Sequence, residues 1–362
     1  MKLFVSFCFL MFACANALAA DMHFEFGGPP ARCPDCGWIQ ATGEITANTP
    51  GAFDQFIARL KIYPKVLRIN SPGGNVRAGI ALGQKLRAKG FATQVGADSP
   101  IPGAMSFGEG RASEKRPGHC LSACAYAFLG GIERSFNGPT QFGVHRFFSR
   151  RTLKGPDAQQ FTAADIDNTQ RLSADLLRYM IQMGVDPRLL ALASEAGAGD
   201  IRWITGAEAR DLRIVYEPEA WKPWRVETYR GGAIAISETN DGKIKMVASC
   251  SGNQGAQVVL TDQTQPDESL FKRDRTCPVR GKHPVFGTFV DQSQVEVFKP
   301  ESGGAGIRFR LPTKNLPLTS PAIFGQFNEN YRVSCTTKRY EGTTENFAPA
   351  VNLAFRNCTN EK

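Results

Sequence analysis

The chain has 362 residues, of which 43 are Lys or Arg and 34 are Asp or Glu, giving a formal net charge of +9 at pH 7. The basic excess is mild and spread along the chain. That is typical of a solvated surface and only weakly favours contact with anionic membranes or cell-wall polymers. No nucleic-acid-binding motif accompanies the charge, so nucleic acid is not an expected partner. A chain of this length can bury the cores of two domains.

The first twenty residues have the pattern of a secretory signal peptide. A basic start at Lys2 is followed by an apolar stretch over residues 3–12 and by small residues at positions 15–20, before Asp21. Beyond them, no stretch of ~18 apolar residues could span a membrane as a helix. We therefore expect a periplasmic or secreted mature protein. Cys14 leaves a lipoprotein interpretation open, although the three residues before it form a poor lipobox.

The cysteines agree with export. An even number remains after cleavage, which favours disulfides over free thiols in a secreted chain: Cys33, Cys36, Cys120, Cys124, Cys250, Cys277, Cys335 and Cys358. By sequence order, the simplest pairing near the C-terminus is Cys250–Cys277 with Cys335–Cys358. The segment from Cys33 to Cys36 fits a structural disulfide, a redox pair or half of a zinc site. No second CxxC exists, so we expect no metal and no cofactor.

Residues 41–220 alternate between helix-like and strand-like patterns, after an N-terminal segment at 21–40. The spacing of apolar residues predicts helices at 50–60, 78–86, 122–129 and 163–183, with two more after Pro187 and at 206–212. Short apolar runs predict strands at 43–45, 66–69, 91–95 and 142–144. The alternation favours an α/β fold in which helices cover a sheet.

The pattern of apolar and polar residues changes near residues 217–225. Helical periodicity disappears, and short strand-like runs are separated by clusters of Gly, Asn, Asp and Pro, at 233–236, 258–260, 295–298 and 307–309. This pattern predicts an all-β domain over residues 225–362, stapled by disulfides. The histidine of this domain is His283, and the domain carries no obvious catalytic group. We therefore expect its role to be binding, assembly or stabilisation of the protein.

Ser122 and His145 fit the needs of a serine hydrolase. A serine hydroxyl is a poor nucleophile until a base takes its proton, and His145 follows a predicted strand soon after Ser122. Acyl transfer also needs N–H donors for the oxyanion. Gly73 and Gly74 let the backbone approach a substrate, and the N–H of Ala123 has no acceptor within its own helix.

Each piece has a structural alternative. Ser122 could be a helix N-cap, which is the usual role of serine at such a place. His145 could be a hydrogen-bonded core histidine, with His119 as a rival base. Residues 70–74 could be a simple turn from strand to helix. The acids that could orient the histidine, Glu195 and Asp200, could be ordinary surface carboxylates.

The motifs from Gly43 to Tyr216 together resemble the proteolytic subunit of Clp protease and the wider Clp/crotonase superfamily. The resemblance is carried by Gly43-Glu44-Ile45, Ile69-Asn70-Ser71-Pro72-Gly73-Gly74, Ser122-Ala123-Cys124-Ala125-Tyr126-Ala127-Phe128, Arg134-Ser135-Phe136, Phe142-Gly143-Val144-His145 and Trp203-Ile204-Thr205-Gly206-Ala207-Glu208-Ala209. It implies an α/β fold, a Clp/crotonase-like spiral of ββα units that often forms rings or stacked trimers. The smaller all-β domain would follow it.

The resemblance also implies roles for single residues: Ser122 as nucleophile, His145 as general base, Gly74 and Ala123 as oxyanion-hole donors beside Gly73, and Asp200 or Glu195 as the acid. The acid is the weakest part, because neither carboxylate sits squarely on the family's aspartate. The pair Cys120 and Cys124 also departs from the family, and a disulfide from either, to the other or to the Cys33–Cys36 segment, could lock the nucleophile turn.

We therefore expect an exported serine hydrolase, a peptidase that cleaves peptides or unfolded proteins through an acyl-enzyme. Because it is exported, a cytoplasmic ATPase is not an expected partner, whereas a homo-oligomer is. The alternative from another class is a catalytically inactive envelope protein that keeps the fold for binding or assembly. A crotonase-type acyl-CoA enzyme fits less well, since coenzyme A is cytoplasmic.

Overall fold

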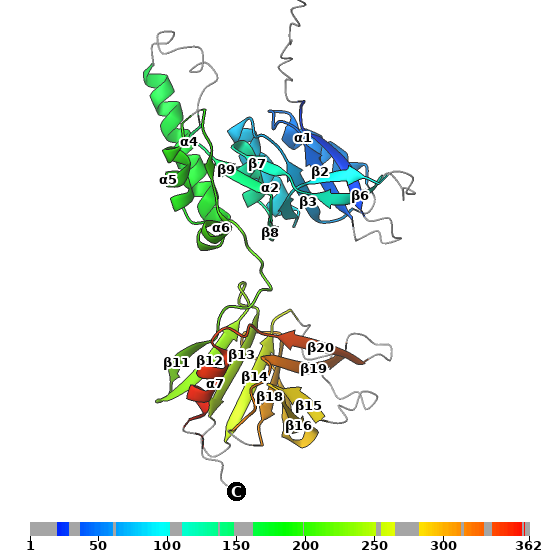
Figure 1. The fold of residues 1–362 in the computed structure, drawn as a ribbon, viewed down its shortest axis with the longest axis vertical. Helices are drawn as coiled ribbons and strands as arrows, with labels where there is room; N and C mark the ends of the chain where they lie inside the picture. Colours follow the sequence, from blue (N-terminus) through cyan, green and yellow to red (C-terminus); the bar gives the residue numbers. More distant parts are fainter. Residues whose placement is uncertain are drawn as a thin grey trace, which may run out of the picture. The chain divides into compact units, whose positions relative to one another are not determined.

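The computed structural model describes residues 20–28, 37–60, 63–101, 111–136, 138–147, 162–197, 199–250, 255–264, 282–312, 315–328, 335–356 and 358. The chain divides into two compact units, Met1–Tyr216 and Glu217–Lys362 (Figure 1). The proposed signal peptide, apart from residue 20, lies outside the described residues, as do Cys33, Cys36 and Cys277. Within the described residues, no helix is long and apolar enough to cross a bilayer.

Unit 1 is a mixed α/β structure whose described residues form a seven-stranded sheet in the order β5-β6-β1-β2-β3-β4-β8 (Figure 1). Its strands are β1 His23–Gly28, β2 Trp38–Thr42, β3 Val66–Asn70, β4 Ala92–Val95, β5 Ala97–Pro100, β6 Arg111–Arg116 and β8 Arg134–Ser135. The strands β2, β3, β4 and β8 run parallel. Leu67 and Ile69 of β3 are fully buried in the apolar core, so the residue between them, Arg68, lies on the opposite face of the sheet.

The helices of unit 1 are α1 Thr49–Ala58, α2 Val76–Ala88, α3 Ala123–Leu129, α4 Ala163–Gln182, α5 Arg188–Glu195 and α6 Gly206–Asp211. Each lies close to a stretch where helical periodicity predicts one. The first turns of α2, α4 and α6 are capped by the side chains of their N-cap residues, whereas the N-cap residues of α1, α3 and α5 provide no side-chain cap. Asn75 accepts a hydrogen bond from the N–H of Ala78 at α2, and Thr162 forms a capping box with Asp165 at α4.

The N-terminal residues take part in this sheet, contrary to the expectation of a separate segment before residue 41. β1 pairs antiparallel with β2, and β2 pairs parallel with β3. The strand expected at residues 43–45 is reduced to isolated bridges, one of them between Ile45 and Gly74. Gly43, at φ 119°, follows β2, which ends at Thr42, directly before the expected strand.

A second sheet in unit 1 has the order β10-β9-β7 within the described residues. Its strands are β7 His119–Leu121, β9 Gln141–Val144 and β10 Arg202–Trp203. A parallel bridge between Ser71 and Cys120 joins β7 to the chain that leaves the end of β3. The two sheets therefore meet where residues 71–74 pass beside the start of α3.

The described part of unit 2 is built mainly of antiparallel strands in two sheets, with strand orders β11-β12-β13-β14-β18-β17 and β16-β15-β19-β20 (Figure 1). The strands are β11 Arg225–Tyr229, β12 Gly232–Glu238, β13 Ile244–Cys250, β14 Ala256–Asp262, β15 Lys282–Val285, β16 Thr288–Asp291, β17 Val295–Phe298, β18 Ala305–Arg310, β19 Ala322–Asn328 and β20 Cys335–Glu341. The expectation of an all-β domain is wrong at one place, because α7 Phe347–Phe355 packs against β12 and β13. Its buried residues follow a helical spacing that the sequence displays: Phe347, Ala350, Val351, Ala354 and Phe355.

A disulfide between Cys250 and Cys358 closes unit 2, with an S–S distance of 2.09 Å. The predicted pairings Cys250–Cys277 and Cys335–Cys358 are therefore wrong. Cys250 ends β13 and Cys358 follows α7, so the packing of α7 on β13 brings together two sulfurs that are 108 residues apart in sequence. Cys250 is thus bonded to a cysteine near the C-terminus and not to the next cysteine in sequence order.

Candidate active site

Ser122 occupies a strained turn between β7 and α3. Its φ of 56° and ψ of −121° lie in a region that residues other than glycine rarely adopt. It stands at the N-cap position of α3, but its side chain makes no capping hydrogen bond. The N-cap alternative therefore does not account for the hydroxyl. A sharp strand-to-helix turn of this kind is how many hydrolases expose a nucleophilic Oγ.

Gly73 lies directly against this turn. A Cβ added to it would stand 2.5 Å from the carbonyl oxygen of Leu121, 2.7 Å from Cβ of Ser122 and 3.1 Å from the backbone nitrogen of Ala123. Its φ of 103° also disfavours any side chain. Backbone bonds hold it there, because the N–H of Ile45 donates to the Gly73 carbonyl at 2.7 Å. The glycine turn is thus packed against the candidate nucleophile.

The two glycines differ in what their N–H groups do. The N–H of Gly73 donates to Oγ of Ser71 at 3.1 Å, so it is already used. Gly74 is bridged in parallel to Ile45, which bonds to the residues on either side of it, at Gly73 and Asn75. In this pattern the N–H of Gly74 points away from Ile45. Of the predicted oxyanion donors, Gly74 and the first helical N–H, at Ala123, are the ones that the geometry favours.

His145 follows β9 at the same end of the sheet as Ser122. β7 and β9 are parallel, with Leu121 opposite Gly143, and the N–H of Ser122 donates to the Gly143 carbonyl at 3.0 Å. The register places Ser122 beside Val144, the residue before His145. The ring of His145 is half-buried, and its Nδ1 lies 2.8 Å from the carbonyl oxygen of Arg146. Nδ1 carries the proton in that contact, which leaves Nε2 as the basic nitrogen.

The predicted acids do not reach this imidazole. Oε2 of Glu195 is 3.3 Å from Nε of Arg202, in an exposed ion pair. Asp200 is exposed, in the loop after α5, where its N–H donates to the Gly197 carbonyl at 3.2 Å. In the part of the chain that the structure describes, no hydrogen bond joins either carboxylate to His145. No hydrogen bond joins the Ser122 hydroxyl to His145 either, a contact that often tightens only when substrate binds.

Arg202 is a residue of this region that the sequence analysis did not single out. It pairs with Glu195 and also with Glu208, whose carboxylate closes a capping box with Thr205 at the start of α6. The Thr205 N–H and the Arg202 guanidinium hold the pKa of Glu208 at about 2. The capping-box spacing of Thr205 and Glu208 is visible in the sequence and could have indicated this cluster.

Cys120 and Cys124 are bonded to each other, with an S–S distance of 1.95 Å. Of the pairings left open by the sequence, this one spans Ser122, since Cys120 lies in β7 and Cys124 in the first turn of α3. Both cysteines are fully buried. The bond therefore ties the strand and the helix together across the strained serine.

Neither a protein-family model nor a curated protein matches this sequence. Among solved structures, the chain is similar to a mutant of ClpP1 from Listeria monocytogenes. The two share 14% sequence identity, the match covers 48% of this chain and 84% of that chain, and the TM-score is 0.32. A likeness at this level suggests at most a Clp-like fold and assigns no role to any residue here.

Proposed function

We propose that this protein is an exported serine hydrolase, a peptidase that acts through Ser122 and His145. The observation that carries the proposal is the strained turn at Ser122, whose hydroxyl does not cap the helix it precedes. Ser122 follows β7, and β7 pairs directly with β9, the strand that His145 follows. Backbone strain of this kind costs about 1–3 kcal/mol and persists where the surrounding structure imposes it, often at functional sites.

In the proposed reaction, Nε2 of His145 takes the proton of Ser122 as Oγ attacks the substrate carbonyl. The resulting oxyanion accepts hydrogen bonds from the N–H groups of Gly74 and Ala123, each commonly worth about 3 kcal/mol. Collapse of this intermediate breaks the scissile bond, and the imidazolium protonates the leaving amine. Water then attacks the acyl-enzyme with the same base, which releases the acid and restores Ser122.

The Arg146 carbonyl accepts from Nδ1 of His145 and orients the ring in this proposal. A carbonyl fixes the tautomer through Nδ1–H, but it lacks the negative charge that stabilises an imidazolium. We propose that Asp200 moves to the imidazole when substrate binds and supplies this charge. Asp200 is favoured over Glu195 for that role, because Glu195 is held by Arg202.

The wider setting is part of the same proposal. Unit 1 would be a Clp-like spiral that forms a homo-oligomer. Unit 2 would bind substrate, take part in assembly of the oligomer or stabilise the protein. The disulfides are compatible with an oxidising compartment such as the periplasm, or with secretion. Substrates would be peptides or unfolded proteins that need no cytoplasmic ATPase.

The alternative is a non-catalytic envelope protein. It is favoured by one observation, that the two predicted acids, Glu195 and Asp200, make no hydrogen bond with His145 in the part of the chain that the structure describes. A fluorophosphonate probe separates the two. We expect it to label Ser122 in the oxidised full-length protein and to fail on Ser122→Ala and His145→Ala, with His119→Ala labelled normally. Absence of labelling in the folded wild type would support the non-catalytic protein.

We expect the disulfide across Ser122 to control the reactivity of the serine. Replacing it in Cys120→Ala/Cys124→Ala should cost roughly 2 kcal/mol of stability for so small a loop. It should also slow fluorophosphonate labelling about tenfold, because the turn can relax. The matched control is Cys250→Ala/Cys358→Ala, which removes the disulfide of unit 2 and should leave the labelling rate unchanged. Equal labelling of both double variants would contradict the prediction.

A further inference from the structure

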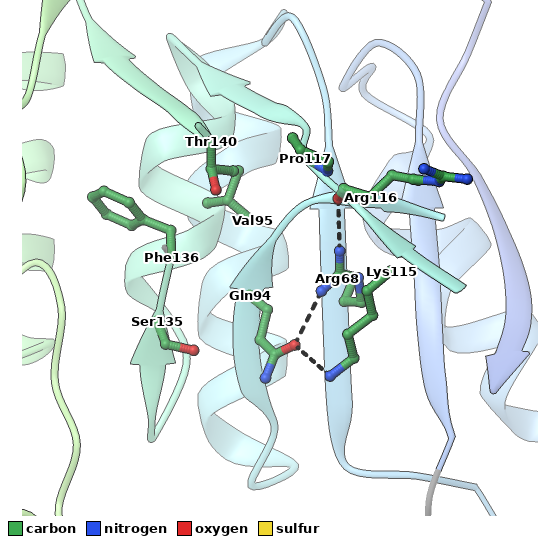
Figure 2. A pocket seen from close by; sticks show the side chains of 9 residues that line it. All are labelled: Arg68, Gln94, Val95, Lys115, Arg116, Pro117, Ser135, Phe136 and Thr140. Atoms are coloured by element: carbon green, nitrogen blue, oxygen red, sulfur yellow. Dashed lines mark hydrogen bonds between the residues drawn. The ribbon is translucent and has the colours of Figure 1, made fainter. Parts of the chain in front are cut away.

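A basic pocket lies in unit 1 at the other end of β7 and β9 from Ser122 and His145. Its volume is about 260 Å³. The described residues that line it come from β3, β4, β6, β8 and the chain just before β7 and β9: Arg68, Gln94, Val95, Lys115, Arg116, Pro117, Ser135, Phe136 and Thr140 (Figure 2). No carboxylate is among them.

The polar floor of the pocket follows from strand register. Arg68 of β3 pairs with Gln94 of β4, and Gln94 pairs with Ser135 of β8. In parallel strands these three side chains form a row on one face of the sheet, opposite to the face where Leu67 and Ile69 enter the core. Figure 2 shows Arg68 and Lys115 both directed at Oε1 of Gln94, at 3.3 and 3.5 Å. Gln94 and Ser135 both line the pocket, and Figure 2 draws no hydrogen bond from the amide nitrogen of Gln94 or the hydroxyl of Ser135 to another residue of the lining.

Arg68 is a buried cation that its surroundings do not neutralise. Only 6% of it is exposed, yet its contacts are with neutral groups: Oε1 of Gln94, the carbonyl oxygens of Ala97 and Arg116, and the Trp38 ring, whose centre lies 5.7 Å from Cζ. Its Nε is buried without a hydrogen-bond partner. Asp98 acts on it only from a distance, and burial still lowers the pKa of Arg68. A buried charge without an ion-pair partner is costly, so an anion bound beside Arg68 would stabilise this arrangement.

Arg134 shows what a purely structural buried arginine looks like in the same unit. It is 1% exposed, but all three of its nitrogens donate to backbone carbonyls, among them Nε to Ile214 at 2.8 Å and Nη2 to Arg213 at 2.8 Å. These backbone carbonyls satisfy the donors of the Arg134 guanidinium, so its burial needs no further partner. Arg68 has a less complete set of partners and opens onto a cavity, so a structural role explains it less well.

Lys115 adds a second positive charge to the pocket. Burial lowers the pKa of Lys115, and the charge of Arg68 lowers it further, so the two cations repel each other. The guanidinium of Arg116 points away from the cavity in Figure 2 and pairs with Glu114. The cavity therefore holds two cations, a hydroxyl and an amide N–H within one concave surface.

We propose that this pocket binds a phosphate group, either free phosphate or the phosphate monoester of a larger molecule. Two cations match a dianion, and a planar guanidinium beside an ammonium and a hydroxyl supplies donors in three dimensions, as a tetrahedral oxyanion requires. A volume of about 260 Å³ exceeds the needs of a water molecule and leaves room for substituents. The site is separate from Ser122 and does not depend on the proposed hydrolase activity.

Calorimetric titration of the full-length protein with inorganic phosphate, at constant ionic strength against chloride, tests the site. We expect saturable binding that falls at least about tenfold in Lys115→Gln and several-fold in Ser135→Ala, since a charge-assisted hydrogen bond is worth more than a neutral one. Nζ of Lys115 lies 5.2 Å from the centre of the Trp38 ring. The matched control is Lys65→Gln, which removes a lysine that also lies over an aromatic ring, 4.4 Å from the centre of Tyr63, but outside the pocket. It should bind phosphate like the wild type.

Further ligands separate the two sources. Tighter binding of glycerol 3-phosphate than of phosphate would support a monoester ligand, and the reverse would support free phosphate. Acetate that binds as tightly as phosphate would overturn the phosphate assignment in favour of a carboxylate. No saturable binding, or the same binding in Lys115→Gln and Lys65→Gln, would overturn the site itself.

Discussion

Removing either Ser122 or His145 is expected to lower the hydrolysis of an activated ester, or of denatured casein, by at least about 10⁴-fold. The two side chains act as one unit, because an uncharged serine without its base is nearly inert. The double variant Ser122→Ala/His145→Ala should therefore lose no more than either single variant, as in other hydrolases whose nucleophile and base are coupled. Initial rates at several substrate concentrations, for all three variants, measure this.

The pattern of loss distinguishes a catalytic unit from a structural one. If His145 were only a core residue, its loss would add to that of Ser122 and would appear in the free energy of unfolding. Asp200→Asn and Glu195→Gln form a matched pair within the same experiment. A loss of rate in Asp200→Asn alone would identify Asp200 as a mobile acid. Wild-type protein that hydrolyses neither substrate would contradict the proposal.

Replacing Gly73 with alanine is expected to damage the site and to destabilise the protein by about 3–5 kcal/mol. The φ of 103° is strained for alanine, and the new Cβ would meet Cβ of Ser122 at 2.7 Å. Backbone strain of about 1–3 kcal/mol and overpacking of similar size combine at this position. The turn at Ser122 cannot give way easily, since the disulfide from Cys120 to Cys124 holds it. We expect fluorophosphonate labelling to be lost in the protein that remains folded.

Gly90 provides the matched control, because it has a φ of 70° and nothing within 4 Å of an added Cβ. Gly90→Ala should therefore show backbone strain alone, about 1–2 kcal/mol, and normal labelling. Chemical unfolding followed by circular dichroism, with labelling of each variant, measures both effects. If Gly73→Ala unfolds and labels like Gly90→Ala, the close packing of Gly73 against Ser122 does not matter in solution.

Local patterns in the sequence predicted most helices of unit 1 because the spacing of apolar residues depends only on near neighbours. The same logic indicated the strand at residues 66–69 and the helix after Ser122. It missed α7, although Phe347 and Val351 carry the helical spacing, because the surrounding strands dominated the interpretation of that region. It also separated residues 21–40 from the sheet, since nothing local reveals that β1 pairs with β2.

The sequence by itself brought forward Ser122, His145 and the paired glycines, because the chemistry of acyl transfer restricts which residue types can serve. Tertiary structure alone decided that the Ser122 hydroxyl caps no helix, that the N–H of Gly73 is taken by Ser71, and that Cys250 pairs with Cys358. The tertiary structure also revealed Arg68 as a buried cation, although in the sequence Arg68 is simply a charged residue within an apolar strand. The physical reason is that hydrogen-bond partners, sulfur neighbours and counter-charges come from strands and helices remote in the chain, and only the packed fold determines which of them meet.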